Sequence, residues 1–503
     1  MNRALKSRKL EAGDFDPKSS GSPPAANIAE TGVAAGLAAP RSTPGETRLT
    51  AVIVACALFM QNLDSTVIAT ALPTIAHAFG SDPVRMNVAL TSYLLSLTVF
   101  IPASGWVADR YGARTVFRAA IVVFTAGSVL CGLARNLPFM VGARVLQGMG
   151  GAMMIPVGRL VLLRTVAKTE LVSAMAWLTI PALIGPVIGP PLGGVIVTYA
   201  DWRWIFFINV PIGALGIVLV TLFVPDIREA RPGRFDAMGL LLCGAALAGF
   251  MLGFETIGRG AVPLALSAGA IAAGLGAALA YAWHARRTSS PLLDLSLLRI
   301  PTFAVSIWSG SLFRIGIGAI PFLLPMMLQV GFGDTALRSG AITFASSAGA
   351  LVMKPISPPA IRVLGFRGTL VVNGAMSAIL LGVCALFRPG WPAAAIYGVL
   401  LVGGFFRSLQ FTAYNTVAYA DIPAQQMSAA TSLYSTLQQL MLTLGIAAGA
   451  AFLDLSMALN RHPAPNEWDF RLAFAGVALI SLFAAPVALA MPKDAGAELT
   501  GRG

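Results

Sequence analysis

The sequence predicts an all-α integral membrane protein that crosses the bilayer fourteen times. Hydrophobic residues make up 56% of the 503 residues and charged residues 11%, with a mean hydropathy of +0.76. Soluble domains carry about 25% charged residues, so this chain has too few polar side chains to cover soluble domains. Its apolar residues form continuous runs of the roughly 20 residues that a helix needs to cross the hydrocarbon. They lack the alternation of a membrane β-barrel.

Fourteen runs satisfy this length criterion, and we expect each to form a helix. The loops between them are too short for a sizeable soluble domain. The runs lie near residues 51–73, 87–108, 116–134, 138–164, 170–197, 203–224, 236–255, 262–284, 302–329, 335–355, 367–387, 391–416, 425–454 and 469–491.

The N-terminal residues 1–48 precede the first run. They are rich in Ala, Gly, Ser, Pro and Thr with mixed charge, which is typical of disorder. A cleaved signal peptide would place its apolar core much earlier. We therefore expect 1–48 to be a disordered cytoplasmic tail, and 493–503 to be a second, shorter tail.

Basic residues in the loops fix the predicted orientation, because cytoplasmic loops carry an excess of Lys and Arg. With the N-terminus inside, 23 of the 35 Lys and Arg residues fall in the tails and inner loops and 8 in outer loops. Both termini are therefore predicted to be cytoplasmic. This bias also explains the net charge of +13 without a nucleic-acid partner. The remaining four lie within spans: Arg144, Arg159, Arg314 and Arg407.

No catalytic or cofactor signature stands out. The four cysteines lie inside apolar runs without metal-ligand spacing, which is typical of buried free thiols: Cys56, Cys131, Cys243 and Cys384. The three histidines form no metal set, no GxxxxGK[ST] nucleotide motif occurs and no nucleophile–base set is evident. We expect no enzyme activity, no cofactor and no use of ATP.

An acid interrupts the first span, in the stretch NLDSTVIATALP. A charge at the centre of a bilayer costs roughly 2.5–3.5 kcal/mol on insertion scales, so Asp64 requires compensation. At about 1.5 Å per residue, Asp64 lies roughly 20 Å from the cytoplasmic end of its span. Arg144 lies roughly 9 Å from the outer end of the fourth span. Their depths are close enough for an ion pair.

Three further motifs follow the first span in order. GWVADRYGART follows the second span, where Gly105 and Gly112 allow close backbone approach and Asp109, Arg110 and Arg114 form a charge cluster. The alternative is a solvated loop that obeys the charge bias. The fourth span contains RVLQG, with Arg144 and Gln147 on one helical face. The fifth carries a string of small and bending residues that favours close helix packing: Gly185, Pro186, Gly189, Pro190, Gly193 and Gly194.

Together these motifs resemble the major facilitator superfamily, in particular its fourteen-span drug:proton antiporter branch of the EmrB/QacA type. LDSTVIATALP resembles the first-span motif of that branch, GWVADRYGART the loop 2–3 motif, RVLQG the fourth-span motif and the Gly/Pro string the antiporter motif. DWRWIFFINVPIG (201–213), RFDAMGLLL (234–242), PLLDLSLLRIPTF (291–303) and FRSLQFTAYNTVAYADIP (406–423) resemble further markers. Ala69 departs from the branch, which usually has Asn there. The second-half counterpart of GWVADRYGART, at 354–368, has no Asp.

The resemblance implies the major facilitator fold. Two six-helix bundles, 49–225 and 301–492, would be related by an axis along the membrane normal. Residues 226–300 would supply two inserted helices. Substrate would bind near the midplane, and the bundles would rock around it.

The same resemblance implies export of drug-like or organic-acid-like small molecules across the inner membrane by proton antiport. Asp64 would couple the proton, tuned by Arg144 and Gln147; the alternative is a structural pair that joins spans one and four. Residues 105–114 would act as a latch in which Asp109 pairs with arginines and a helix N-terminus while the cytoplasmic side is closed. Other readings are a nutrient symporter or facilitator and a membrane sensor or channel. Some exporters of this branch use a periplasmic adaptor as partner.

Two more intramembrane arginines bear on the substrate. If Arg314 and Arg407 face the cavity, it is net positive and suits a carboxylate-bearing or zwitterionic solute. The alternative is that they bond backbone carbonyls. Arg159 lies near the cytoplasmic end of the fourth span, and we expect it to snorkel to the membrane surface. Polar residues that could line the cavity or bond neighbouring helices are Tyr93, Trp308, Gln329, Gln410, Tyr414, Asn415, Gln438 and Gln439.

Overall fold

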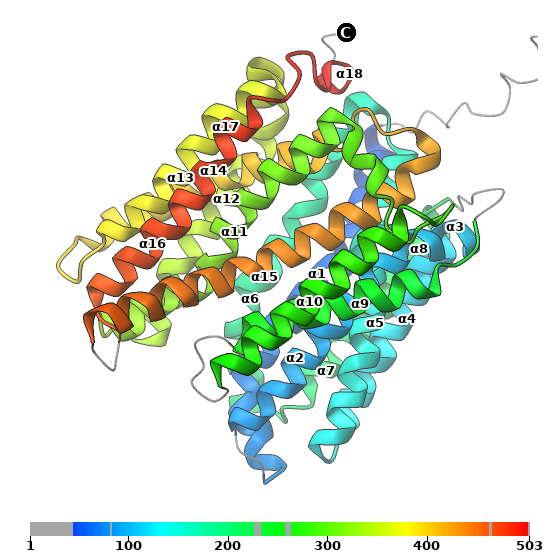
Figure 1. Cartoon of the computed structure of the whole chain (residues 1–503). Coiled ribbons are helices and arrows are strands. Elements are labelled where there is room, and N and C mark those ends of the chain that lie inside the picture. Colours follow the sequence, from blue (N-terminus) through cyan, green and yellow to red (C-terminus); the bar gives the residue numbers. More distant parts are fainter. Residues whose placement is uncertain (1–43, 81–82, 226–232, 257–262, 462–464, 501–503) are drawn as a thin grey trace, which may run out of the picture. The chain divides into compact units, whose positions relative to one another are not determined.

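The computed structural model describes residues 44–80, 83–225, 233–256, 263–461 and 465–500, which form helices joined by turns, with no strand among them (Figure 1). Within these residues, 12 segments are long and apolar enough to cross a membrane. The prediction of an all-α, multi-pass membrane protein is confirmed. Most of the predicted N-terminal tail lies outside the described residues, and the first helix begins at Pro44.

The first half of the chain forms a group of packed helices. Its elements are α1 (Pro44–Ala78), α2 (Pro83–Phe100), the short η1 (Ile101–Ala103), α3 (Ser104–Tyr111), α4 (Ala113–Leu133), α5 (Leu137–Thr165), η2 (Lys168–Glu170), α6 (Leu171–Tyr199), α7 (Trp204–Phe207) and α8 (Asn209–Phe223).

The second half forms another group, in yellow-green to red in Figure 1. Its elements are η3 (Leu295–Arg299), α11 (Pro301–Met326), η4 (Met327–Gly331), α12 (Ala336–Gly368), η5 (Thr369–Asn373), α13 (Gly374–Val383), η6 (Cys384–Leu386), α14 (Ala393–Val417), η7 (Ala424–Gln426), α15 (Met427–Asn460), α16 (Glu467–Leu482), α17 (Ala484–Ala488) and α18 (Ala497–Thr500).

The packing of the first half recurs in the second. Helix α1 packs on α6, α2 on α5, and α4 on α8; equivalently, α11 packs on α15, α12 on α14, and α13 on α16. Contacts between the halves also come in matched pairs, since α3 and α5 contact α15 while α12 and α14 contact α6. This correspondence is the structural form of an internal repeat.

Two helices stand between the halves in sequence. Helices α9 (Ala237–Thr256) and α10 (Leu264–Ala285) pack on each other, and α9 also contacts α2 and α15. Asp236 fixes their ends: its carboxylate accepts hydrogen bonds from the backbone N–H groups of Gly239 and Leu292, at 2.7 and 3.2 Å, and lies 2.8 Å from Nε2 of His284. The inserted pair is thus tied to the segment that leads into α11.

The stretch 105–114 is more helical than predicted, since the second span was expected to end near residue 108. Residues Ser104–Tyr111 form α3, so Asp109 and Arg110 lie on a helix, and the chain turns only at Gly112. Gly112 has φ +88°, a backbone conformation that favours glycine.

The matching region of the second half is also more helical than predicted, since the span at 335–355 was expected to end there. Helix α12 continues to Gly368 and breaks at Gly365, which has φ +70°. Lys354 therefore lies inside the helix, only 2% exposed, and its Nζ donates to Oγ1 of Thr412 on α14 at 3.1 Å. Lys354 stands at the end of the predicted span 335–355 and was counted with the basic residues of the inner side; that count was wrong, because α12 runs on through Pro355, Pro358 and Pro359.

Candidate functional site

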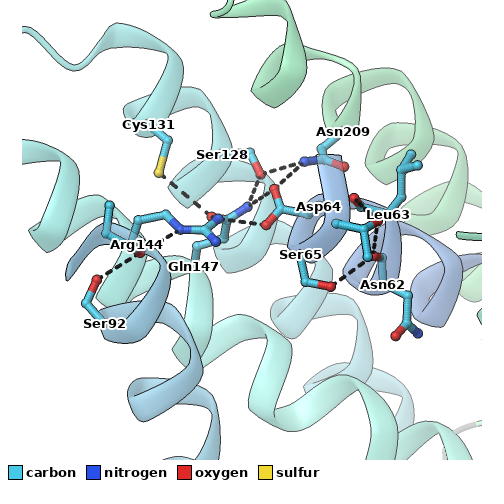
Figure 2. A network of polar contacts seen from close by, with 12 residues as sticks. Asn62, Leu63, Asp64, Ser65, Ser92, Ser128, Cys131, Arg144, Gln147 and Asn209 are labelled. Carbon is cyan, nitrogen blue, oxygen red and sulfur yellow. Dashed lines mark hydrogen bonds and ion pairs between the residues drawn. The ribbon is translucent and has the colours of Figure 1, made fainter. Parts of the chain in front are cut away.

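A buried carboxylate on α1 is the centre of the main polar cluster (Figure 2). The side chain of Asp64 is 0% exposed, and its Oδ2 forms an ion pair with Nη1 of Arg144 on α5 at 2.7 Å. Its Oδ1 accepts hydrogen bonds from Nε2 of Gln147 at 2.8 Å and from Nδ2 of Asn209 on α8 at 3.1 Å. Three donors on two other helices therefore compensate the charge of the acid.

The basic partner is equally enclosed. Besides Asp64, Nη1 of Arg144 donates to Oε1 of Gln147 at 2.5 Å, and Nε donates to the carbonyl oxygen of Ala89 on α2 at 3.2 Å. The guanidinium carbon lies 4.3 Å from the centre of the Tyr93 ring. The prediction that Asp64 and Arg144 lie close enough to pair is confirmed, and Tyr93 belongs to this cluster.

Residues behind the pair hold it in place. Oγ of Ser128 on α4 accepts hydrogen bonds from Gln147 at 2.7 Å and from Asn209 at 3.2 Å. Sγ of Cys131 lies 3.8 Å from Oε1 of Gln147. The cluster thus joins α1, α2, α4, α5 and α8, which means that any change at Asp64 reaches most of the first half.

Two buried polar atoms of this cluster have no hydrogen-bond partner in the described part of the chain: Nη2 of Arg144 and Oδ1 of Asn209. Each such atom costs about 1–3 kcal/mol, so the arrangement is not optimised for stability alone. Incomplete satisfaction of this kind is typical of functional sites.

The Gly/Pro string of the fifth predicted span packs beside the acid. A Cβ at Gly189 would lie 2.1 Å from Oγ1 of Thr66, and one at Gly185 would lie 3.0 Å from the backbone nitrogen of Leu63. These glycines bring α6 directly against α1 on both sides of Asp64 in sequence. Gly193 is buried, whereas a Cβ at Gly194 would meet nothing, so close packing stops there. The side chains of Pro186 and Pro190 lie outside the described residues.

A second cluster joins the two halves around Arg159, in contrast to the snorkelling expected from its sequence position. Arg159 is 5% exposed, and its Nη1 donates to the hydroxyls of Tyr419 and Ser435, at 3.2 and 3.4 Å. Its Nη2 donates to Oε1 of Gln438 at 3.3 Å. The prediction failed because the acceptors come from α15 and the turn after α14, which no local pattern relates to α5.

Arg314 on α11 lies at the same cluster. Its Nη2 donates to the hydroxyl of Tyr434, and its guanidinium carbon lies 4.7 Å from the centre of the Tyr434 ring. The Tyr414 and Phe411 rings are 5.9 and 5.6 Å away. Arg314 therefore bonds a side chain rather than the backbone carbonyls of the alternative reading. The hydroxyl of Tyr414 bonds Ser309.

Arg407 is separate from this cluster. Its Nη2 donates to Ser346, which places it between α14 and α12.

The remaining cavity candidates divide by burial. Gln410 is 0% exposed; it accepts from Asn373 at 2.8 Å and donates to the carbonyl of Leu370 at 2.9 Å, so it bonds neighbouring helix turns. Asn415 is also buried, while Trp308 and Gln329 are exposed. The structure favours helix–helix bonding for Gln410 and brings Gln438 and Tyr414 close to the Arg159 and Arg314 cluster.

The 105–114 motif contacts the other half through Asp109. Its Oδ1 lies 3.2 Å from Nη2 of Arg164 and accepts from the hydroxyl of Ser428, at the N-terminus of α15. Arg164 also donates to Ser428 at 2.8 Å. A Cβ at Gly105 would lie 2.7 Å from the carbonyl oxygen of Ser428, so only glycine permits this approach. Arg110 is exposed.

Arg114 serves another contact, since it donates to the carbonyl of Thr221 within the first half.

Asn209 and Ser128 are site residues that sequence reasoning missed. Asn209 lies in the quoted stretch DWRWIFFINVPIG, as the only amide in an apolar run, and that isolation was the available signal. Ser128 carried no signal, because a single serine in an apolar helix commonly bonds its own backbone.

The fold and the buried ion pair define a multi-pass membrane protein with a charged site inside its helices, and comparison identifies the family. The sequence profile of the Major Facilitator Superfamily matches residues 54–446. The chain belongs to this superfamily, whose members are transporters rather than enzymes.

Relatives of known name cover nearly the whole chain. A protein of Klebsiella pneumoniae (strain 342) named "Putative multidrug resistance protein MdtD" is 36% identical over 90% of this chain and 96% of its own. The protein of the same name from Yersinia enterocolitica is 37% identical over 88% and 95%.

Solved structures share the fold. The human organic anion transporter MFSD10 aligns with a TM-score of 0.63 at 15% identity, covering 89% of this chain and all of that chain. The proton:xylose symporter XylE aligns with a TM-score of 0.61 at 14% identity, covering 90% and 97%.

The enclosed ion pair predicts strong coupling between Asp64 and Arg144 in stability. Arg144→Gln should destabilise the protein by about 3–5 kcal/mol, because removing one partner leaves an uncompensated buried charge. The double variant Asp64→Asn with Arg144→Gln should regain part of that loss. The apparent melting temperatures of the purified single and double variants measure both effects. Additive losses in the double variant would contradict this coupling.

Proposed function

We propose that the chain is a proton-coupled exporter of small molecules in the inner membrane, working by antiport. The observation that carries the proposal is the enclosed Asp64–Arg144 pair within a superfamily of transporters. An ionisable residue at membrane depth is a functional candidate by default. The names of the bacterial relatives support drug-like cargo, and the two buried arginines near Tyr434 extend the range to organic acids.

We propose fourteen membrane spans, with both termini in the cytoplasm. One of the 12 candidate segments, Arg338–Leu386, is 49 residues long and contains the break at Gly365, which fits two passes. Helix α6, of 29 residues, lies outside the 12 segments and fits one more pass. The two halves would correspond to bundles 49–225 and 301–492, with α9 and α10 inserted between them. The excess of basic residues in the predicted inner loops supports the orientation.

The proposed coupling follows from charge compensation. With Asp64 ionised, its carboxylate balances Arg144 and accepts from Gln147 and Asn209. A proton on Asp64 removes that balance and leaves a buried guanidinium without a counter-charge, which is unfavourable in an apolar interior. Rearrangement of the first half then lowers the free energy of the protein. Proton uptake on one side and release on the other would drive this cycle.

Helix α6 offers a mechanical link from the acid to the interface between the halves. It packs on α1 with Gly185 against Leu63 and Gly189 against Thr66, and it also contacts α12 and α14 of the second half. A shift of α1 that follows protonation of Asp64 would therefore move a helix that lies at the interface. Such a shared element is what coupling between two sites requires.

The 105–114 motif would lock the cytoplasmic side in the closed position. Asp109 lies between Arg164 and the N-terminus of α15, where the positive end of a helix dipole favours an anion. Separation of the halves would break the contacts of Asp109 and Arg164 with Ser428. We infer that the conformation described here is closed on that side.

The antiport proposal predicts proton movement when a transported probe is added. In everted membrane vesicles with an acidic lumen, ethidium, norfloxacin or salicylate, whichever is transported, should enter in exchange for protons and collapse the pH gradient. A pH-sensitive dye measures this. Asp64→Asn should abolish the response, because an asparagine at this position cannot release a proton. The variant protein should still be present in the membrane.

Asp201→Asn is the matched control, since Asp201 is an exposed acid whose carboxylate bonds the nearby Arg203. It should behave as wild type. Full proton-driven exchange by Asp64→Asn would rule out Asp64 as the coupling acid, and exchange without proton movement would indicate a facilitator.

The latch predicts a shift in cysteine accessibility. Thr431→Cys introduces a thiol into the buried face of α15 that follows Ser428, and maleimide should label it slowly. Adding Asp109→Asn should speed labelling severalfold, because the closed side loses its charged contacts. Arg110→Gln, a change at an exposed neighbour, should not. Equal labelling rates in all three backgrounds would count against the latch.

A further inference from the structure

Two arginines from different halves of the chain meet at one tyrosine ring. The guanidinium carbons of Arg159 on α5 and Arg314 on α11 lie 5.2 and 4.7 Å from the centre of the Tyr434 ring. Both side chains are at least nine-tenths buried. Two like charges therefore share one enclosed location between the halves.

Neither charge is compensated by an acid. Among the described residues, no carboxylate lies within ion-pair distance of Arg159 or Arg314, and their acceptors are hydroxyl and amide oxygens. The Nε of each has no hydrogen-bond partner there. Buried charges are ordinarily paired, because desolvation is costly. The arrangement contrasts with Arg144, which has Asp64.

Movement of the halves would remove the hydrogen-bond acceptors of Arg159. All three acceptors of Arg159 belong to the second half: Tyr419, Ser435 and Gln438. When the halves separate in the proposed transport cycle, Arg159 loses all of them and requires another acceptor. An anion that enters between the halves supplies one, and it can reach Arg314 after displacing the neutral hydroxyl of Tyr434.

We propose that Arg159 and Arg314 bind an acidic group of the transported molecule, so that the cargo is an amphipathic oxyacid anion. This inference rests on the proposed export function. The two fork-shaped guanidinium groups suit carboxylate or phosphate oxygens. The rings of Tyr434, Tyr414 and Phe411 around Arg314 suit an aromatic or apolar body next to the acid. Arg407, which bonds Ser346, is not part of this site.

Binding to the full-length purified protein in lipid nanodiscs tests the assignment without transport. Calorimetric titration compares salicylate and phenyl phosphate with the neutral salicylamide and the cationic benzylamine. Wild type should bind at least one of the two anions about tenfold or more tightly than salicylamide. The tighter of the two anions distinguishes a carboxylate from a phosphate cargo. Binding of salicylamide as tight as that of both anions, or binding of benzylamine tighter than that of both anions, would overturn the proposal.

Variants locate the site. Arg159→Gln and Arg314→Gln should each weaken binding of the preferred anion by about tenfold and leave salicylamide unchanged. Arg314→Lys, which keeps the charge and loses the fork, should fall between wild type and Arg314→Gln. Arg407→Gln removes a buried cation elsewhere in the second half and should bind as wild type. Loss of anion preference in Arg407→Gln, with none in the other two, would overturn the assignment.

The two proposals can fail separately. Proton-driven exchange of ethidium that depends on Asp64, in a protein without anion preference, would leave the antiporter standing and refute the anion site. Selective binding of salicylate or phenyl phosphate without proton movement would do the reverse.

Discussion

The structure depends on a buried ion pair between Asp64 and Arg144. Each side chain compensates the charge of the other in an apolar interior. Hydrogen bonds with Gln147, Asn209 and Ser128 fix the geometry of the pair. Because the partners lie on α1 and α5 and their supports on α4 and α8, the pair constrains how the helices of the first half pack. A group whose charge changes at this location would affect the whole half.

The two halves use charge differently, although their packing is alike. In the first half the buried pair is internally balanced. In the second half Arg314, Lys354 and Arg407 are buried against hydroxyl groups. The same asymmetry appears at the half-to-half contacts, where Asp109 has no counterpart acid in 354–368. The balanced pair at Asp64 suits proton handling, whereas Arg159 of the first half joins Arg314 of the second in a buried pair of cations without an acid, which suits an anionic cargo.

The sequence was sufficient for features that composition and local pattern determine. Apolar length predicted the helices, and depth along two helices predicted that Asp64 could meet Arg144. It was insufficient where partners come from distant segments. The position of Arg159 near the end of its span predicted a side chain that reaches the membrane surface. Only the packing of α15 against α5 explains its burial. The span at 335–355 was expected to end at Lys354 and Pro355, yet α12 continues through three prolines to Gly368. Asn209 joins the acid only because α8 packs beside α1.

The most direct test of the account is whether Asp64 itself gains and loses a proton. Infrared titration of the purified protein follows the carbonyl stretch of a protonated carboxylic acid, and the difference between wild type and Asp64→Asn isolates this residue. The account predicts a band that appears in wild type as the pH falls from the value on one side of the membrane to the value on the other. The band should be missing from the variant. A spectrum in which Asp64 stays ionised throughout that range, with and without a transported probe, would contradict it.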